Sequence, residues 1–441
     1  MLSIAKNLPY QEIGNTEIVP KYNIETLDIN ETISELSYLT HNYFRYYGKF
    51  PSKVGKTIIS KLSDEGLISA KNDFIFDNYV GSGTSLVEAK LSGFDSTGVD
   101  INPFAILASK VKTYNYSVSE LKNIMVELFG KIEAYEHNKQ EISLLHDTNQ
   151  EIAAQILVLA KKVYTEFPDV EKWFTTQAIQ NLAVIKYFIL QMPLGKAREF
   201  FLLSFFAIIR RVSKAFDGEV RPHVNKTKKE RDVIAAYEKK VLEMVSTMSE
   251  WNHATDSNVV SDAHLCDNTD IKKVSGVLDR FSASTQKTLG LVISHPPYLN
   301  CFDYIPVYRL KFLWAFGFDE IYGEMDYSTI KKSELKSYPA STERLIYDYF
   351  DHNKIAYQIM YENLRHNGYC CVVIGDCTIQ KELFSVHKIF INQLENIGFV
   401  VDRIIYRSTS YGLGKYAYKH KADYNEKADG KKDAILFFRK P

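Results

Sequence analysis

The chain has 441 residues, of which 45% are hydrophobic and 24% are charged, and its 54 basic and 54 acidic side chains give a net charge of zero. These values are typical of a globular protein and argue against a disordered chain. The length predicts one large domain or two interlocked domains, and a neutral chain can contact nucleic acid only through local patches.

Membrane and metal signals are weak in this sequence. No run approaches the roughly 18 apolar residues that cross a bilayer, and the first residues lack the apolar stretch of a signal peptide. We therefore expect a cytoplasmic protein with no membrane partner. The five cysteines show neither metal spacing nor a disulfide framework. His41, His264 and His366 are scattered, so we interpret them as surface or supporting residues and expect no metal.

A pattern of strand, glycine turn, helix and strand runs from about residue 73 to residue 113. The first strand, DFIFD, ends in Asp77, and the next turn, NYVGSGT, contains Gly81 and Gly83, which leave backbone amides open to a ligand. Asp100 ends the second strand, STGVD, a position from which a carboxylate reaches ribose hydroxyls. This pattern predicts half of a doubly wound sheet with a site for a nucleoside.

Missing residues narrow the choice of cofactor. A dinucleotide site needs a third glycine where this chain has Leu86, and a phosphate-binding loop needs a Gly-Lys-Ser/Thr run that the turn lacks. A nucleoside-containing cofactor without phosphates fits better. A glycine turn that binds no ligand is the alternative at this point.

The pattern becomes helical between residues 117 and 255, where apolar residues recur at intervals of three and four. The runs EIAAQILVLAKKVY, IQNLAVIKYFILQM and FFLLSFFAIIRRVSKAF predict helices of an insertion. Strand-like runs return as GLVISHPPY, YCCVVIGD, FVVDRIIYRS and DAILFFRKP. We expect these runs to complete the sheet.

The first of these strands leads into an unusual turn, ISHPPYLNCFDY, at residues 293–304. Two prolines fix the backbone between His295 and Tyr298. This turn and the glycine turn both follow the carboxyl ends of strands, which is the edge of an open sheet where ligands bind. We therefore expect the two turns to face each other across one cleft.

Taken together, DNYVGSGT, GVDINP and HPPY resemble motifs of the S-adenosylmethionine-dependent DNA methyltransferases that modify cytosine N4 or adenine N6. HNYFRYYGKFP, VVSDAHL, LNCFDYIPVYRLKFLWAFGF and NLRHNGYCCVVIGD are similar to that family's usual context. The resemblance covers most of residues 40–116 and 256–441. It implies an α/β fold, a Rossmann-like class I methyltransferase sheet of the seven-stranded type with a helical insertion, and S-adenosylmethionine as cofactor.

The resemblance also implies a role for individual residues. Asp100 would take the ribose hydroxyls, Ile101 would pack on the adenine, and Asp262 would accept its amino group. Lys49 and Phe50 would close the pocket from the other side. The methionine part would be held by Asp77, Gly81, Ser82, Gly83 and Thr84. The catalytic turn would consist of His295, Pro296, Pro297 and Tyr298.

The chemistry of an exocyclic amine explains this turn. The amine is a poor nucleophile because its lone pair is delocalised into the ring, so acceptors must draw its hydrogens into a geometry that turns the lone pair toward the methyl group. In the family, the residue before the prolines and the carbonyl of the first proline, here Pro296, accept those hydrogens. Tyr298 would stack on a base flipped out of the duplex.

His295 departs from the family, which has Asp, Asn or Ser at this place. Three interpretations are open: a neutral imidazole that works as an acceptor, a weak or inactive site, and a residue that was changed in the sequence. A nearby sulfonium would disfavour imidazolium, so the acceptor interpretation predicts that activity falls below about pH 6. A smaller departure is Asn78 and Tyr79, where the family often has Pro-Phe.

Basic residues of the insertion are candidates for DNA contact. Arg210, Arg211 and Lys214 begin a basic stretch that suits phosphate binding, although most residues of this stretch are better interpreted as a solvated face. Tyr304 and Arg309 follow the catalytic turn and are placed to contact the backbone of a flipped nucleotide. A second basic stretch, at residues 408–432, is either a loop over DNA or an exposed hairpin.

We expect four regions: an extension at 1–40, a cofactor-binding half at 41–116, a helical target-recognition insertion at 117–255 and a catalytic half at 256–441. The expected function is methylation of double-stranded DNA, with cytosine N4 favoured because YLNCFDY resembles the serine-bearing branch. A restriction-modification or host-defence setting would add a cognate restriction endonuclease as partner. The alternatives are an RNA amino-methyltransferase and an impaired enzyme that only binds cofactor or DNA.

Overall fold

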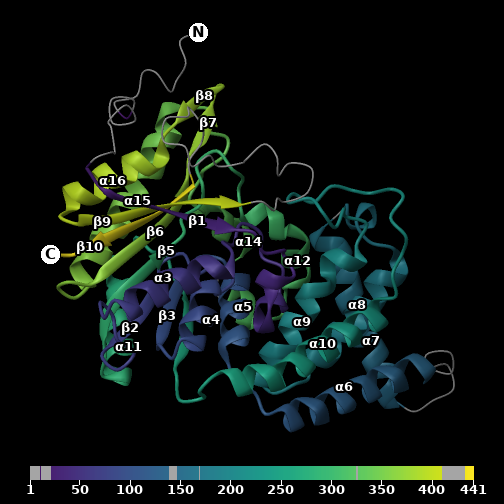
Figure 1. The fold of residues 1–441 in the computed structure, drawn as a ribbon. Helices are drawn as coiled ribbons and strands as arrows, with labels where there is room; N and C mark the ends of the chain where they lie inside the picture. Colours follow the sequence, from purple (N-terminus) through teal and green to yellow (C-terminus); the bar gives the residue numbers. More distant parts are fainter. Residues whose placement is uncertain (1–9, 11–20, 139–146, 168, 324–325, 410–432) are drawn as a thin grey trace.

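The structure, a computed structural model, describes residues 10, 21–138, 147–167, 169–323, 326–409 and 433–441. Its centre is a mostly parallel sheet with the strand order β1-β9-β10-β6-β5-β2-β3-β4, in which β10 runs antiparallel to β6 and β9 (Figure 1). The predicted Rossmann-like α/β fold is confirmed. The strands are β1 (Asn23–Ile29), β2 (Asp73–Asp77), β3 (Ser96–Asp100), β4 (Ser261–Leu265), β5 (Thr288–Ser294), β6 (Tyr369–Gly375), β9 (Val400–Thr409) and β10 (Asp433–Arg439).

Helices cover both faces of the sheet because its central strands are apolar on both sides. In β2, Phe74 and Phe76 pack into one cluster with α11, α15 and α16, whereas Ile75 between them joins a second cluster with α3 and α4. The alternation follows from the two-residue period of a strand. These helices are α3 (Ser52–Asp64), α4 (Thr84–Leu91), α11 (Ile271–Thr285), α15 (Glu343–Asn363) and α16 (Val386–Ile397).

The sequence DINPFA starts the helix after β3 by a simple mechanism. The side chain of Asn102 accepts the backbone amide of Phe104 at 3.1 Å, and Pro103 occupies the first helical position, where a missing amide costs nothing. This helix, α5 (Pro103–Thr113), is almost entirely buried. It connects the sheet to the inserted helices.

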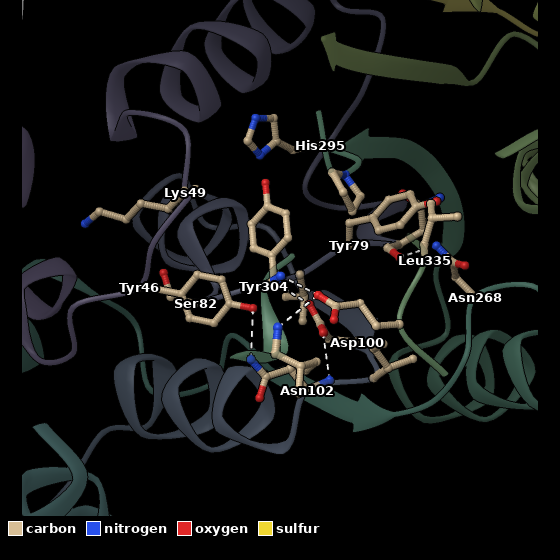
Figure 2. A pocket seen from close by; sticks show the side chains of 18 of the residues that line it. Tyr46, Lys49, Tyr79, Ser82, Asp100, Asn102, Asn268, His295, Tyr304 and Leu335 are labelled. Atoms are coloured by element: carbon tan, nitrogen blue, oxygen red, sulfur yellow. Dashed lines mark hydrogen bonds between the residues drawn. The ribbon is translucent and has the colours of Figure 1, made fainter. Parts of the chain in front are cut away.

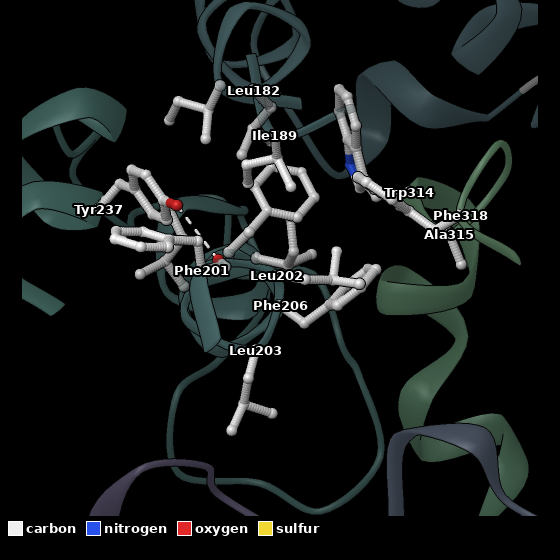
Figure 3. Close-up of a cluster of buried hydrophobic side chains, with 14 of the residues drawn as sticks. Leu182, Ile189, Phe201, Leu202, Leu203, Phe206, Tyr237, Trp314, Ala315 and Phe318 are labelled. Carbon is white, nitrogen blue, oxygen red and sulfur yellow. Dashed lines mark hydrogen bonds between the residues drawn. The ribbon is translucent and has the colours of Figure 1, made fainter. Parts of the chain in front are cut away.

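Helices fill the predicted insertion, and a dense apolar cluster holds them together (Figure 3). Phe201, Leu202 and Leu203 of α9 are all buried, and the hydroxyl of Tyr237 on α10 donates to the carbonyl of Phe201 at 3.1 Å. The same cluster includes Trp314, which follows the turn of His295 in sequence. The helices are α6 (Val118–Asn138), α7 (Asp147–Glu166), α8 (Thr176–Leu190), α9 (Lys196–Val212) and α10 (Val233–Ala254).

Short elements complete the described chain. Two short helices, η1 (Glu35–Ser37) and η2 (Leu39–Asn42), precede β2, and a third, η3 (Val170–Lys172), precedes α8. Those after β5 are η4 (Ile305–Tyr308), α12 (Arg309–Trp314), α13 (Asp319–Tyr322), α14 (Tyr327–Ser333) and the antiparallel pair β7 (Cys377–Ile379) and β8 (Glu382–Phe384). No helix in the described ranges is long and apolar enough to cross a membrane.

Residues 21–40 contribute a strand to the sheet. Strand β1 pairs in parallel with β9, from Asn23 opposite Arg403 to Ile29 opposite Thr409, and so adds an edge strand to the expected sheet of the seven-stranded type. Its sequence, NIETLDI, lacks a clean alternation, which is why periodicity gave no signal for it.

Candidate active site

One cleft lies at the carboxyl ends of β2, β3, β4 and β5 and encloses about 840 Å³ of empty space, its open mouth included (Figure 2). The glycine turn after β2 lines one side of the cleft, and the turn after β5 lines another. The structure therefore brings the two predicted turns together, as expected from their places at strand ends.

The glycine turn is held from below by buried polar side chains. Asp77 is buried, accepts the Ser85 hydroxyl and accepts the Tyr79 amide at 2.9 Å; burial raises its pKa to about 7. Gly83 has φ +74° and faces Ser109 instead of the cleft. Lys112 donates to the carbonyl of Ser82 at 2.9 Å. Asp77 and Gly83 thus lie beneath the turn, while the cleft itself is lined by Gly81, Ser82 and Thr84.

Asp100 lines the cleft with its carboxylate fixed. One oxygen accepts the amide of Gly81 at 2.9 Å, and the other accepts the amide of Asn102 at 2.8 Å. Burial raises the pKa of this carboxyl to about 6, against the lowering effect of these amides. Ile101 follows it in the lining. The lone pairs that the amides leave open are available to hydroxyl donors.

Unpaired polar atoms gather beside the glycine turn. The side-chain amide of Asn78 and the hydroxyls of Ser82 and Thr84 are buried in the lining and have no hydrogen-bond partner within the described ranges. Burying such groups without partners costs free energy, so native structures usually pair them. Their position indicates a polar ligand at this end of the cleft.

Lys49 and Phe50 also line the cleft. Phe50 meets the ring of His295 edge to face, with ring centroids 5.1 Å apart. Burial lowers the pKa of Lys49 to about 8, and its ammonium group lies 3.4 Å from the carbonyl of His41. Figure 2 shows the Lys49 side chain extending away from the ring of Tyr304.

Asp262 is not among the residues that line the cleft, which corrects the role expected for it. It lies inside β4 and pairs with Lys110 at 3.9 Å and with His264 at 3.4 Å. Asp267, two residues beyond the end of β4, lines the cleft instead, and its Oδ1 accepts the Thr269 amide at 2.9 Å. Ligands bind beyond the carboxyl ends of parallel strands, so a correct prediction of where β4 ends would have indicated Asp267.

The turn after β5 is held by hydrogen bonds to α15. Tyr349 of α15 donates to the carbonyl of Pro297 at 2.7 Å, and the hydroxyls of Ser294 and Tyr357 lie 2.9 Å apart. Among the described residues, no donor reaches the carbonyl of Pro296. His295 and Pro297 line the cleft, whereas Pro296 and the half-buried Tyr298 are not among its lining residues.

Burial keeps the imidazole of His295 neutral. Desolvation, with a smaller contribution from the charge of Arg407, lowers the pKa of His295 to about 3. The ring is held by edge contacts with Phe50 and Tyr298, both at 5.1 Å between centroids. A ring with this pKa stays neutral at pH 6, so the structure removes the reason to expect that protonation of His295 reduces activity below about pH 6.

Tyr304, which we expected to contact the backbone of a flipped nucleotide, occupies the middle of the cleft. Figure 2 shows its hydroxyl directed toward His295. Its ring lies so close to Gly48 that a Cβ there would come within 2.5 Å of it. Glu334, a lining residue without any sequence signal, accepts the amide of Tyr304 and, at 2.9 Å, that of Ile305. Burial raises the pKa of Glu334 to about 7.

The basic residues predicted for DNA contact differ in their surroundings. The guanidinium of Arg210 is largely buried and donates to the carbonyls of Phe216, at 3.0 Å, and Val220, at 2.8 Å, as well as to that of Glu219. Arg210 therefore supports the loop after α9 instead of facing outward. Arg211 is exposed. Lys214 donates to the carbonyl of Glu171 at 2.9 Å, and the guanidinium of Arg309 lies 4.4 Å from the centre of the Phe167 ring.

The structure also bears on His41, on the metal interpretation of the histidines and on the second basic stretch. His41 is buried, and its Nε2 lies 2.7 Å from the carboxylate of Glu88, so it is a supporting and not a surface residue. In the described ranges, no group of three or more His, Cys, Asp or Glu side chains could hold a metal ion. Most of the second basic stretch, with Tyr411, Tyr416 and Tyr418, lies outside the described residues.

No family model matches the chain. The chain is 28% identical over 184 residues to the type II methyltransferase M.MvaI of Kocuria varians, covering 42% of this chain and 36% of that protein. It is 32% identical over 98 residues to M.MjaII of Methanocaldococcus jannaschii, and 34% identical over 91 residues to M.BsoBI of Geobacillus stearothermophilus. These two matches cover 22% and 20% of this chain and 17% of each relative.

Among solved structures, an rRNA methyltransferase AviRa from Streptomyces viridochromogenes matches with a TM-score of 0.33 and 10% identity over 93% of this chain and 94% of that one. A likeness at this level adds nothing to the fold seen in the sheet itself. The matches in sequence span about a third of the first relative's length and about a sixth of the other two. They confirm the resemblance that the motifs indicated: over these segments, the chain is a relative of type II methyltransferases.

Proposed function

We propose that the protein transfers a methyl group from S-adenosylmethionine to an exocyclic amino group of a base flipped out of double-stranded DNA, with cytosine N4 favoured over adenine N6. The observation that carries this proposal is the single cleft shared by the glycine turn, Asp100 and the turn of His295. The sequence likeness to type II methyltransferases supports it. The preference for cytosine rests on the flanking sequence YLNCFDY.

The residues in the cleft fit this cofactor. The unpaired polar atoms of Asn78, Ser82 and Thr84 suit the carboxylate and ammonium of a methionine chain. Asp100 would accept ribose hydroxyls, and Ile101 would pack on the adenine beside Asp267, whose carboxylate would accept the adenine amino group. Lys49 and Phe50 would close the cleft over it, and Asp77 and Gly83 would hold the turn from below. When bound, S-adenosylmethionine supplies an electrophilic methyl group on a sulfonium.

The turn after β5 would prepare the amine. The carbonyl of Pro296 would accept one hydrogen of the amino group, and the neutral ring of His295 would accept the other. With a pKa of about 3, His295 can accept this hydrogen bond but cannot retain the released proton near neutral pH. We therefore assign it as an acceptor and not as a general base, with Pro297 fixing the backbone. Tyr298 would stack on the base.

The DNA would meet the insertion and the residues that follow the turn. Arg211 and Arg309 are exposed and, with Lys214, would contact phosphates, whereas Arg210 would act by supporting their loop. Tyr304 would contact the flipped nucleotide inside the cleft. We propose a restriction-modification setting in the cytoplasm, with a cognate endonuclease as partner.

The decisive experiment is single-molecule sequencing of DNA from a methylation-free host that expresses the native protein or the variant His295→Ser. A modified motif with the native protein is the expected result and would identify both base and site. Modification only with the serine variant would mean that His295 impairs the native site. If neither protein modifies DNA while purified protein still binds S-adenosylmethionine, DNA methylation is refuted, and transfer to RNA is tested next.

A further inference from the structure

We propose that Arg407 and Asp433 are positioning residues, which hold the ring of Tyr298 in the one orientation that can stack on the target base. This inference rests on the proposed function, because a stacking role for Tyr298 presupposes a flipped base. Neither residue lines the cleft. Their effect on the reaction would pass through the tyrosine hydroxyl.

Three hydrogen bonds connect these side chains. The hydroxyl of Tyr298 donates to Asp433 Oδ1 at 3.2 Å and accepts a bond from Arg407 Nη2 at 2.9 Å. Arg407 Nε donates to the same oxygen of Asp433 at 2.8 Å. The ion pair is well shielded, with side-chain exposures of 5% for Arg407 and 19% for Asp433. Charge-assisted bonds in such surroundings restrain the hydroxyl strongly.

The sheet also packs against the ring of Tyr298. Asp433 on β10 lies opposite Gly375 on β6, and a Cβ at Gly375 would come within 2.7 Å of Tyr298 Cε2. The ring therefore lies against backbone that only glycine leaves open. On another side it meets His295 edge to face, with centroids 5.1 Å apart. Gly375 limits the ring's position, the ion pair fixes its tip, and His295 limits its rotation.

Such a restraint matters for a stacking surface. A tyrosine ring that is free to swing must be ordered when a base arrives, and this ordering cost reduces the free energy gained by stacking. A ring that is already fixed avoids that cost and places the base at a defined distance from the methyl donor. Because Tyr298 is not among the residues assigned to the cofactor, loss of the restraint should affect methyl transfer and leave cofactor binding unchanged.

The test is a double-mutant cycle in the 441-residue protein with Tyr298→Phe, Asp433→Ala, which removes the acceptor oxygen, and the double variant. Arg403→Gln is the control, because Arg403 lies on the same strand as Arg407 but pairs with Glu65 at 2.6 Å. We expect each single variant to lower the single-turnover rate about tenfold. The double variant should be no slower than the slower single variant, and KM for S-adenosylmethionine should change less than twofold throughout.

A second readout is independent of activity. Crystal structures of the native protein and of Asp433→Ala show whether the ring of Tyr298 leaves its place against Gly375, which we expect. An unmoved ring overturns the proposal, and so does an Asp433→Ala effect that is equally large in the Tyr298→Phe background. If the native protein methylates no DNA, the proposed function has failed, and the ring position alone then decides whether Arg407 and Asp433 restrain Tyr298.

Discussion

The carboxylate of Asp100 accepts the backbone amide of Gly81 at 2.9 Å, so the end of β3 and the glycine turn after β2 form one rigid unit. The bond explains how two segments about 20 residues apart can present a single surface to a nucleoside. It also makes the protonation state of one carboxyl important for the whole cofactor end of the cleft.

The first prediction concerns pH. Because the pKa of Asp100 is about 6 in the free protein, and hydroxyl donors favour its ionised form, cofactor binding should strengthen as pH rises through 6 and level off above. Lowering the pH from 7.5 to 5.5 should weaken binding about fourfold. Titration calorimetry at several pH values measures this change. Asp100→Asn should bind weakly at every pH, and a wild-type profile as flat as that of the variant would contradict the assignment.

At saturating cofactor, the rate of methyl transfer should have no inflection that belongs to His295 between pH 5 and pH 8. Burial lowers the pKa of His295 to about 3, so its ring stays neutral over this range. Single-turnover rates of the native protein and of His295→Asn, an uncharged acceptor, should therefore have profiles of the same shape. An inflection near pH 6 that disappears in His295→Asn would show that the imidazole does become protonated.

The third prediction separates two acidic residues of one segment. Asp267→Asn retains an oxygen for the Thr269 amide but replaces the other acceptor with an NH₂ group, which cannot accept the adenine amino group. The dissociation constant for S-adenosylmethionine should rise about tenfold. Asp262→Asn, which alters a partly exposed pair with Lys110, should change it less than twofold. The reverse order would restore Asp262 as the adenine residue.

The fourth prediction concerns a glycine of the turn. A Cβ at Gly83 would lie 2.8 Å from Ser109 Oγ and 2.9 Å from Ser109 Cα, and the residue has φ +74°. Gly83→Ala should lower the free energy of unfolding by about 2–4 kcal/mol, because a backbone atom cannot move aside easily. Gly93→Ala is the matched control: φ is +79°, but nothing lies within 4 Å, so about 1 kcal/mol is expected. Urea denaturation measures the free energy of unfolding of both variants. Equal losses in the two would show that packing at Gly83 is unimportant.

The fifth prediction distinguishes two neighbouring arginines. Arg210→Gln removes donors to the loop carbonyls and should lower the free energy of unfolding by about 2–4 kcal/mol. Arg211→Gln should change the free energy of unfolding by less than about 0.5 kcal/mol. It should weaken DNA binding and reduce the slope of log K against log salt concentration by about one unit, because one phosphate contact is lost. Denaturation and salt-dependent binding on the same preparations test both. Equal stabilities with equal losses of DNA binding would show that Arg210 also contacts phosphate.

Much of this architecture could be predicted because its signals are local. The strands DFIFD and STGVD, the turn between them and the helical stretch from residue 117 depend on periodicity and on glycine or proline at fixed places. The place of Asp100 in the site was predicted from its spacing of about 20 residues from the glycine turn. Residues whose position depends on tertiary packing could not be found in this way. Glu334 enters the cleft from the end of α14, and the guanidinium of Arg210 turns inward because it donates to carbonyls of the loop after α9.

The apolar cluster shared by the inserted helices and the segment after the catalytic turn has a consequence for engineering. Lys186 on α8 donates to the carbonyls of Trp314, at 2.9 Å, and Phe316, and Trp314 itself is fully buried among residues of α9. Exchanging the insertion for that of another enzyme would cut through this core and expose Trp314 and its neighbours. Under the proposed function, a change of target sequence would therefore have to come from substitutions in surface loops and not from a transplanted module.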